Sequence, residues 1–227
     1  MTVWRSRNSA LTWYPPLVDA KLPMPQTSLV LGVKDFSGVL DGEEPAAELI
    51  EAIRLAALQI GLPCFVRSDI MSAKHEGSTA TRLEDTDKDS IITVLYNIAE
   101  AHGMAFMVPD PAAIMVREWL TMTKTAHHDG KNMGEEYRIF VEGDSVVCNH
   151  PYWPQAPELY KPSIPALADL EYLASRAGSK LGGAWSIDFA MTTKGPMLID
   201  CAAAGRSWHW ETCPNIGRWP ENAAEDM

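Results

Sequence analysis

Hydrophobic and polar positions repeat along this chain with two periods, which predict helices mainly in its first half and strands mainly in its second. Up to about residue 112, apolar positions three and four residues apart indicate helices at about 43–60 and 87–102. Short apolar runs at 27–33 and 63–67 indicate strands. The polar, glycine-bearing stretch 68–81 is more typical of a mobile loop than of packed structure.

Both predicted helices carry end signals. The first has acidic residues in its first turn, Pro45 near position N1 and Gly61 as its stop. The second is expected to be capped by Asp87 or Asp89 and to end at Gly103.

From residue 113 the pattern changes to short apolar segments of the strand type. Glycine and aspartate in Glu142–Ser145 predict a hairpin turn, and Thr192–Gly195 predicts a second turn. A helix is expected over 165–178. The expected strands are 114–120, 137–141, 145–148, 185–189 and 197–200.

These elements predict an α+β protein with two lobes. An aromatic and proline-rich N-terminal segment, 1–26, is too rich in proline for a long helix and is expected to pack onto something larger. The first lobe is expected over 27–112 and the second over 113–219. An acidic tail, 220–227, is expected to fray.

Composition narrows the classes of function. The 227 residues carry a formal charge of −11, which opposes general binding to nucleic acid, although a local basic pocket for one short acceptor end stays open. Four widely spaced cysteines and the absence of a secretory signal predict reduced thiols in the cytoplasm. No window reaches the roughly 20 apolar residues of a membrane span.

Two acidic residues follow apolar runs near the end of the second lobe. Asp188 stands in Ala184–Ala190 and Asp200 closes Pro196–Asp200, on either side of the second predicted turn. A hairpin of period two is expected to bring both carboxylates to one end of a sheet, where a cation or partner must offset their loss of water. Paired carboxylates suit Mg²⁺, which takes oxygen ligands and shares them with nucleotide phosphates.

The order of the charged positions along the strands is similar to that of an ATP-grasp domain, specifically the clade named for two arginines and a lysine. The resemblance covers about 22–205, where 22–27 looks like the approach to the first nucleotide-binding lobe. The other segments that carry it are Pro63–Lys74, Val116–Leu120, Glu136–Val141 and Trp185–Ala190. The resemblance implies an ATP-grasp fold, with two α+β lobes and a nucleotide cleft between them.

The resemblance also implies ATP and Mg²⁺ as cofactors and a carboxylate–amine ligase as the activity. Such a ligase activates a small-molecule or peptide carboxylate as an acyl phosphate, which an amine then captures. Two other functions stay open: an ATP-binding assembly or chaperone factor without ligase turnover, and an ATP-grasp kinase. A homodimer or a protein partner also stays open, since the usual preceding domain needs far more than the roughly 20 residues before the resemblance begins.

Two cationic residues lie at the predicted loop, one just before it and one within it. The planar fork of Arg67 suits phosphate oxygens, in a place where typical ATP-grasp proteins use lysine. Its alternative is a surface ion pair with Asp69. Lys74, among small neighbours, is expected to fold over the triphosphate, and its alternative is a solvated side chain.

The segment Glu118, Trp119 and Leu120 corresponds to the passage between the lobes, where the resemblance implies contact with the nucleotide. Trp119 could instead belong to a core. Arg138 is expected to face the cleft and stabilise the transferred phosphoryl group, and its alternative is a pair with Glu136. Arg117 is expected to be structural, because strand alternation turns it away from Glu118.

The two acids match the metal positions of the resembled family, but one neighbour departs from it. Members often place asparagine two residues after the second acid, whereas this chain has Ala202. A weakened metal site, a completing water or inefficient catalysis are the open consequences. Arg206 is a candidate for a substrate carboxylate or phosphate, with a surface role as its alternative.

Other chemical signals are weak. His127 and His128 lie in a turn-prone stretch with few acidic partners. Cys201, His209 and Cys213 could gather a thiophilic ion, but no Cys-x-x-Cys pair accompanies them. The chain contains neither a P-loop motif nor a Gly-x-Ser-x-Gly elbow.

Overall fold

The computed structural model describes residues 6–34, 36–72, 80–104, 110–128, 131–160 and 164–219. The chain divides into two compact units. The first unit comprises residues 25–120, and the second comprises residues 1–24 together with residues 121–227. Each contains a four-stranded sheet with antiparallel pairing and at least one packed helix, so the predicted α+β class is confirmed.

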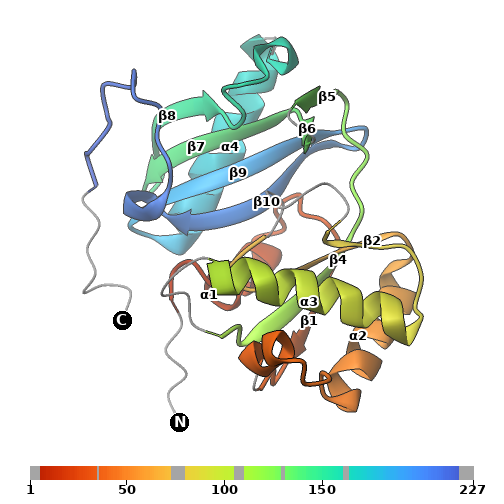
Figure 1. Cartoon of the computed structure of the whole chain (residues 1–227). Helices are drawn as coiled ribbons and strands as arrows, with labels where there is room; N and C mark the ends of the chain where they lie inside the picture. The colour runs from red at the N-terminus through yellow and green to blue at the C-terminus, as the bar shows by residue number, and fades with distance from the viewer. Residues whose placement is uncertain are drawn as a thin grey trace. The chain divides into compact units, whose positions relative to one another are not determined.

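The first unit packs its helices onto one face of its sheet, whose strand order is β1-β4-β2-β3 (Figure 1). One hydrophobic core joins both helices to alternate strand residues such as Val30, Val66 and Val116. The elements are β1 Thr27–Leu31, the 3₁₀ helix η1 Phe36–Asp41, α2 Ala47–Ile60, β2 Cys64–Ser68, β3 Arg82–Leu83, α3 Lys88–Met104 and β4 Ala113–Glu118.

The predicted helix ends are partly right. Gly61 is the C-cap of α2 with φ of 96°, a conformation that other residues adopt only with strain. Pro45 lies before the N-cap, Ala46, and not at N1, because Ala46 still has an extended ψ of 135°. Helix α3 continues through Gly103 to Met104. A single glycine inside a packed helix costs only about 1 kcal/mol, which tertiary contacts can offset.

Strand β4 lies in the first unit, which ends at Leu120 and so extends past the lobe boundary expected at 112/113. The strand pairs with both β1 and β2 and is therefore a central strand of that sheet. A strand-type pattern identifies the strand but not the sheet that it joins, which is why the sequence pattern grouped it with the later strands.

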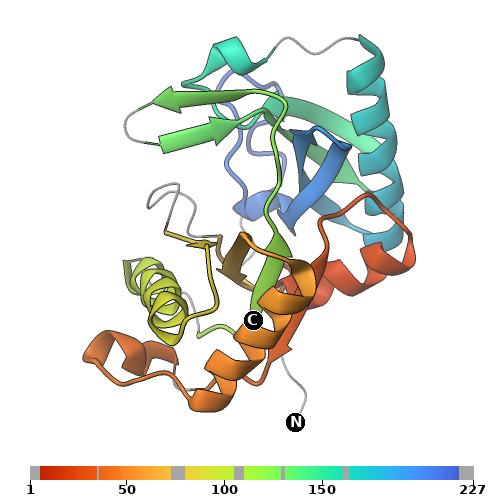
Figure 2. The same ribbon diagram turned by 90° about the vertical axis from the view of Figure 1, so that its right-hand side faces the viewer.

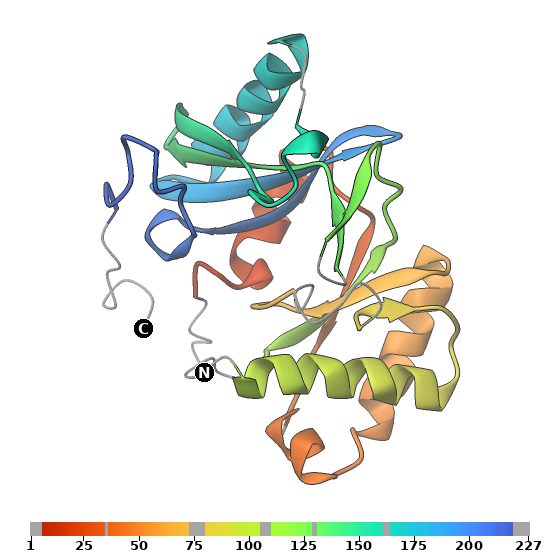
Figure 3. The same ribbon diagram turned by 45° about the horizontal axis from the view of Figure 1, so that its top comes forward.

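The second unit is built on a sheet of strand order β10-β9-β7-β8 (Figure 1). Helix α4 packs on one face, and the C-terminal segment, residues 207–219, packs on the other (Figure 3). The hairpin β5–β6 forms a separate two-stranded sheet (Figure 2). The elements are α1 Ala10–Asp19, β5 Thr125–His128, β6 Lys131–Gly134, β7 Glu136–Glu142, β8 Ser145–Pro151, η3 Pro157–Leu159, α4 Ile164–Leu181, β9 Ala184–Thr192, β10 Gly195–Ala203 and η4 Ala204–Arg206.

Both predicted turns of this unit are confirmed. Glu142 pairs with Ser145, and Thr192 pairs with Gly195, so each turn has two central residues. Gly143 and Gly195 have φ values of 58° and 103°, which explains glycine at these two positions.

Among the described helices, none has the length and apolar character that crossing a bilayer requires.

The N-terminal segment packs on the second unit through a short helix that the sequence did not predict. Ser9 caps α1 by accepting a hydrogen bond from the Leu11 amide, and Pro15 and Pro16 lie inside the helix. Trp13 is fully buried, and α1 contacts α4 and β10. The prediction that this segment packs onto something larger is therefore confirmed.

Two β-bulges change the register of the four-stranded sheet in the second unit. On β10 the pairing with β9 shifts between Leu198 and Asp200, so Ile199 is the extra residue. On β8 the pairing with β7 shifts between Phe140 and Val141, and Val147 is the extra residue. Since side chains alternate between faces, the residues beyond each bulge point to the face opposite to the one that unbroken pairing would give them.

Candidate functional site

A row of polar residues crosses one face of the sheet in the second unit. Asp200 lies opposite Asp188, Asp188 opposite Arg138, and Arg138 opposite His150. Residues directly opposite one another in adjacent strands point to the same face, with Cβ atoms about 4.5–5.5 Å apart. This is the face opposite α4, because Val141, of opposite parity to Arg138, lies against Gly178 of α4.

The sequence correctly paired the two acids but misplaced them along the sheet. Strand β9 continues from Asp188 to Thr192, and β10 continues from Asp200 to Ala203, so both acids lie within strands and not at a sheet end. An unbroken hairpin from the turn would set Ile199 opposite Asp188, leaving Asp200 on the α4 face. The bulge at Ile199 brings the two carboxylates onto one face.

Arg138 and Asp188 form a two-point ion pair. Arg138 Nε donates to Asp188 Oδ1 and Nη2 donates to Oδ2, each at 2.8 Å. The two side chains are 14% and 5% exposed. Glu136, the alternative partner predicted for Arg138, lies opposite Ala190 on β9. The carboxylate that binds the Arg138 guanidinium at two points is that of Asp188, which is also a candidate metal ligand.

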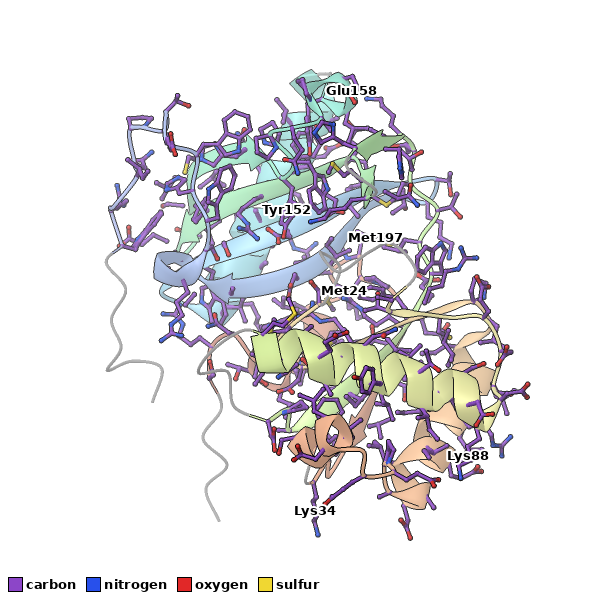
Figure 4. All side chains as sticks on the ribbon, viewed as in Figure 1. Met24, Lys34, Lys88, Tyr152, Glu158 and Met197 are labelled. Atoms are coloured by element: carbon purple, nitrogen blue, oxygen red, sulfur yellow. The ribbon has the colours of Figure 1, made fainter. Side chains whose placement is uncertain are left out.

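Further groups surround the guanidinium. Burial alone would lower the pKa of Arg138, but Asp188 outweighs it, and Asp200 adds to the rise. Arg138 Nη1 donates to the carbonyl oxygen of Trp208 at 3.3 Å. The ring centroid of Tyr152, labelled in Figure 4, lies 4.7 Å from its central carbon, a cation–π distance. Arg138 is thus held from several sides at the centre of the row.

The carboxylates keep acceptor capacity for a cation. An ionised carboxylate has about four lone-pair sites, and the arginine fork uses two of those on Asp188. Asp200 Oδ1 accepts a hydrogen bond from the Cys201 amide at 3.1 Å. The ligand atoms that the two carboxylates offer are all oxygen. The pair therefore fits Mg²⁺.

The position of the missing asparagine lies beside a pair of hydroxyl groups. Ala202 pairs across the strands with Ser186, on the same face as Asp188. Ser186 Oγ lies 2.5 Å from Ser207 Oγ. Sequence reasoning did not identify either serine, although strand alternation from Asp188 could have found Ser186.

The first unit holds the remaining predicted nucleotide residues. Arg67 is 2% exposed and its Nε donates to the Ser68 carbonyl oxygen at 3.0 Å. Asp69 is also buried, so neither member of the alternative ion pair lies at the surface. Arg117 is buried and its Nε donates to Thr27 Oγ1 at 3.2 Å, in keeping with the structural role expected for it.

The end of β4 and the two residues after it, 118–120, are half-buried. Glu118 Oε1 accepts from the Gln26 amide at 3.4 Å, and the Arg82 guanidinium lies 4.6 Å from the ring centroid of Trp119. Leu120 ends this unit. Lys74 falls within 73–79, outside the residues that the structure describes.

The structure thus brings Arg138, Asp188 and Asp200 together within the second unit, while Arg67 and Glu118–Leu120 belong to the first. Arg206 is exposed in η4, seven residues before Cys213. Sequence reasoning did not identify His150 or Tyr152 because the bulge at Val147 sets the face of β8. Burial, then His209 and Arg138, lower the pKa of His150 to about 4, so its imidazole is neutral at pH 7.

The sequence matches no protein-family profile and no curated protein, but its fold is similar to solved structures. C-terminally truncated Cdc123 from Schizosaccharomyces pombe has 16% identity over 87% of this chain and 83% of its own, with a TM-score of 0.60. Carboxyaminoimidazole ribonucleotide synthase from Aspergillus clavatus, complexed with ATP, has 13% identity over 87% and 45%, with a TM-score of 0.55.

A RimK domain protein of the ATP-grasp type from Sphaerobacter thermophilus has 19% identity over 86% of this chain and 57% of its own, with a TM-score of 0.50. The chain therefore spans about half the length of the last two proteins. Its fold is that of ATP-grasp proteins, with two α+β units. At these identities the likeness shows the fold alone, and membership of the clade with two arginines and a lysine stays a prediction.

Proposed function

We propose that the chain is an ATP- and Mg²⁺-dependent carboxylate–amine ligase that works through an acyl phosphate. The observation that carries the proposal is the row Asp200–Asp188–Arg138 on one sheet face of a protein with the ATP-grasp fold. ATP binding by a structural neighbour supports the choice of nucleotide. Oxygen ligands next to a fixed arginine suit a magnesium-bound polyphosphate.

Each residue of the row has a proposed task. Asp188 and Asp200 would hold Mg²⁺, which when bound neutralises charge on the β- and γ-phosphate oxygens. Arg138 would donate hydrogen bonds to the transferred phosphoryl group, whose oxygens carry the negative charge. Arg138 already lies beside Asp188, so it needs little rearrangement to exchange one oxygen acceptor for another.

Residues of the first unit, and one of the second, complete the proposal on the strength of the family resemblance. Arg67 and Lys74 would bind phosphate oxygens, and Glu118, Trp119 and Leu120 would contact the adenosine. Arg206 would bind the carboxylate or phosphate of the second substrate. The γ-phosphoryl group passes to a carboxylate oxygen with release of ADP, and the amine nitrogen then displaces phosphate and loses a proton.

Magnesium-dependent ATP binding tests the first half of the proposal. We expect calorimetric titration with ATP to show binding that Mg²⁺ strengthens, and the gain to disappear in Asp188→Asn and Asp200→Asn. A ligand at 100 times its Kd stabilises the folded state by about 2.7 kcal/mol, so a thermal shift should follow the same pattern. Asp144→Asn, at an exposed turn position, is the matched control and should behave as the wild type.

One result of these titrations would contradict the proposal. If both acid variants keep the full Mg²⁺-dependent gain in ATP affinity, the row is not the metal site. Binding measured directly by titration separates this loss from any loss of fold stability, which circular dichroism of each variant monitors.

A second candidate is an ATP-binding assembly or chaperone factor without turnover. Ala202 favours it, because the extra oxygen ligand of many family members is absent at that position. ADP release stimulated by a mixture of carboxylates and amines supports the ligase. ATP binding without such release, together with a co-purifying protein, supports the factor. A stable phosphate adduct without amide, detected by product mass, indicates a kinase.

A further inference from the structure

Four potential metal ligands meet on the polar face of the second unit, beside Arg138. Cys148, His150, His209 and Cys213 each offer one ligand atom, and these atoms all lie within 4.8 Å of one another. Cys148 Sγ and His209 Nε2 are 3.1 Å apart. In a tetrahedral zinc site with two sulfur and two nitrogen ligands, neighbouring ligand atoms lie about 3.3–3.8 Å apart. Small side-chain movements would therefore bring the four atoms to bonding positions.

Two separate parts of the chain supply these ligands. Cys148 and His150 are two residues apart on β8, and the bulge at Val147 turns both to the face of Arg138. His209 and Cys213 come from the C-terminal segment, where the Cys213 amide donates to the Trp210 carbonyl oxygen at 2.9 Å and forms a tight turn. The spacing is Cys-x-His followed by His-x-x-x-Cys, with two ligands on each element.

The grouping differs from the one that the sequence suggested. Cys201 lies opposite Ile187, on the α4 face, whereas Cys148 and His150 join His209 and Cys213. His127 and His128 are exposed on β5, away from this group. The sequence showed no metal motif because its two ligand pairs lie far apart along the chain and meet only after a bulge.

The surroundings resemble those of a structural metal centre. Trp210 stacks on His150 with 6.2 Å between the ring centroids, and the ring centroids of His209 and Phe140 lie 4.3 Å apart. Trp219 stacks on the same Phe140 ring at 5.6 Å. Such an aromatic shell excludes water and fixes the orientation of the ligands.

Hydrogen bonding around the group also points to an absent partner. His150 Nε2 is buried, and it neither donates nor accepts a hydrogen bond within the described part of the chain. Buried polar side-chain atoms are rarely left in this state, so each such atom calls for an explanation. Cys213 Sγ accepts a hydrogen bond from the Asn215 amide at 3.4 Å, which ties the thiol to the turn that carries it.

Charge balance favours a divalent ion of the zinc type. Two thiolates and two neutral imidazoles cancel the charge of a divalent cation, so the nearby Arg138 guanidinium would face a neutral centre. Thiolate and imidazole ligands in a tetrahedral set are those of Zn²⁺ and not of Mg²⁺. The Mg²⁺ proposed at the carboxylates and an ion held by these thiolates and imidazoles would therefore use different ligand chemistry.

We propose that Cys148, His150, His209 and Cys213 bind a structural Zn²⁺ ion that fixes the C-terminal segment to β8. The carbonyl oxygen of Trp208, next to His209, accepts a hydrogen bond from Arg138. The zinc would thus hold this segment in place beside the arginine at the centre of the polar row. The proposal does not depend on the ligase function.

Metal content of the full chain tests the site. The protein should be produced with zinc in the medium, purified under reducing conditions and dialysed against metal-free buffer before elemental analysis. We expect one zinc per chain in the wild type and less than about a tenth of that in Cys148→Ser and Cys213→Ser, since loss of one ligand of a closed site weakens it strongly. Cys64→Ser and Cys201→Ser remove buried thiols outside the group and should keep the zinc.

Wild-type protein provides a test that does not depend on variant folding. A strong chelator should lower the melting temperature, and Zn²⁺, but not Mg²⁺, should restore it. Replacement by Co²⁺ should give the visible absorption of a tetrahedral ion with thiolate ligands. The proposal is overturned if the wild type contains no stoichiometric zinc, if Cys148→Ser keeps it in full, or if Cys148 and Cys213 are disulfide-bonded in the purified protein.

Discussion

The two faces of the β10–β9–β7–β8 sheet share one backbone but carry side chains of opposite character. On one face Ile139, Ile187 and Phe189 are fully buried, and Leu170 of α4 is buried with them. On the other face Arg138 and Asp188 form an ion pair one residue away along the same strands. A single step of the strand pleat thus separates residues that stabilise the unit from residues suited to chemistry.

The polar face is buried too, but by a different structure. A regular helix covers the apolar face, whereas an irregular segment that carries aromatic residues and two candidate metal ligands covers the polar one. A buried ion pair contributes little stability in itself, but leaving one member alone is costly. Replacing one charged residue of the polar face should therefore lower the free energy of unfolding by more than the intact ion pair contributes to it.

The largest effect is expected from breaking the ion pair. Arg138→Met leaves the Asp188 carboxylate buried without its two-point partner and should lower the free energy of unfolding by about 3 kcal/mol. Urea denaturation followed by tryptophan fluorescence measures it, because every tryptophan except Trp119 belongs to the second unit. The transition therefore reports mainly on the unit that carries the pair.

A double variant sharpens this test. In Arg138→Met with Asp188→Leu both charges are absent, and most of the lost stability should return, since apolar replacement of a whole buried pair is often neutral. If the single variant unfolds within about 0.5 kcal/mol of the wild type, the pair is not coupled to the stability of the fold.

A smaller effect is expected on the apolar face. A Cβ at Gly178 would lie 2.7 Å from Val141 Cγ2 and closer still to the carbonyl oxygen of Gly143. Gly178→Ala should therefore push α4 away from β7 and cost about 2 kcal/mol in the same urea experiment. Ser179→Ala, at the next and exposed helix position, should stay within about 0.5 kcal/mol of the wild type. Equal effects of the two variants would contradict the close packing.

The smallest effect is expected at the edge of the polar face. Arg218 Nη2 lies 2.7 Å from Glu142 Oε2, but both side chains are about half exposed. Arg218→Ala should change the free energy of unfolding by less than about 1 kcal/mol, because water and salt screen such a pair. Zinc content should also stay the same. A loss above about 2 kcal/mol would mean that this ion pair, and not the metal group, holds the C-terminal segment.

Most of the strands and helices could be predicted from the sequence, because their signals are local. The turns at Gly143 and Gly195 and the stop at Gly61 each follow from a backbone conformation that glycine adopts readily. The assignment of β4 to the first unit and the packing of α1 on the second could not be predicted, since they depend on contacts between distant residues. A pattern of apolar residues does not say which sheet receives it.

The candidate site shows the same limit. The ion pair of Arg138 with Asp188 was not expected, because cross-strand neighbours depend on register and not on sequence distance. The two acids were paired correctly, but the regular hairpin assumed for them would have set them on opposite faces. The group around Cys148 went unnoticed for the same reason: its face depends on an extra residue within β8.

The bulge at Ile199 absorbs the one residue by which the β10 arm of the hairpin exceeds the β9 arm. Removing Ile199 alone would preserve every charged residue and the turn, and would leave Leu198 and Asp200 in regular pairing with Phe189 and Asp188. The two carboxylates would stay on one face, without the extra residue that bends the strand between them and the turn. Homologues with a one-residue gap at this point would thus keep the same acids opposite one another, whereas regular pairing of the full-length arm would separate them.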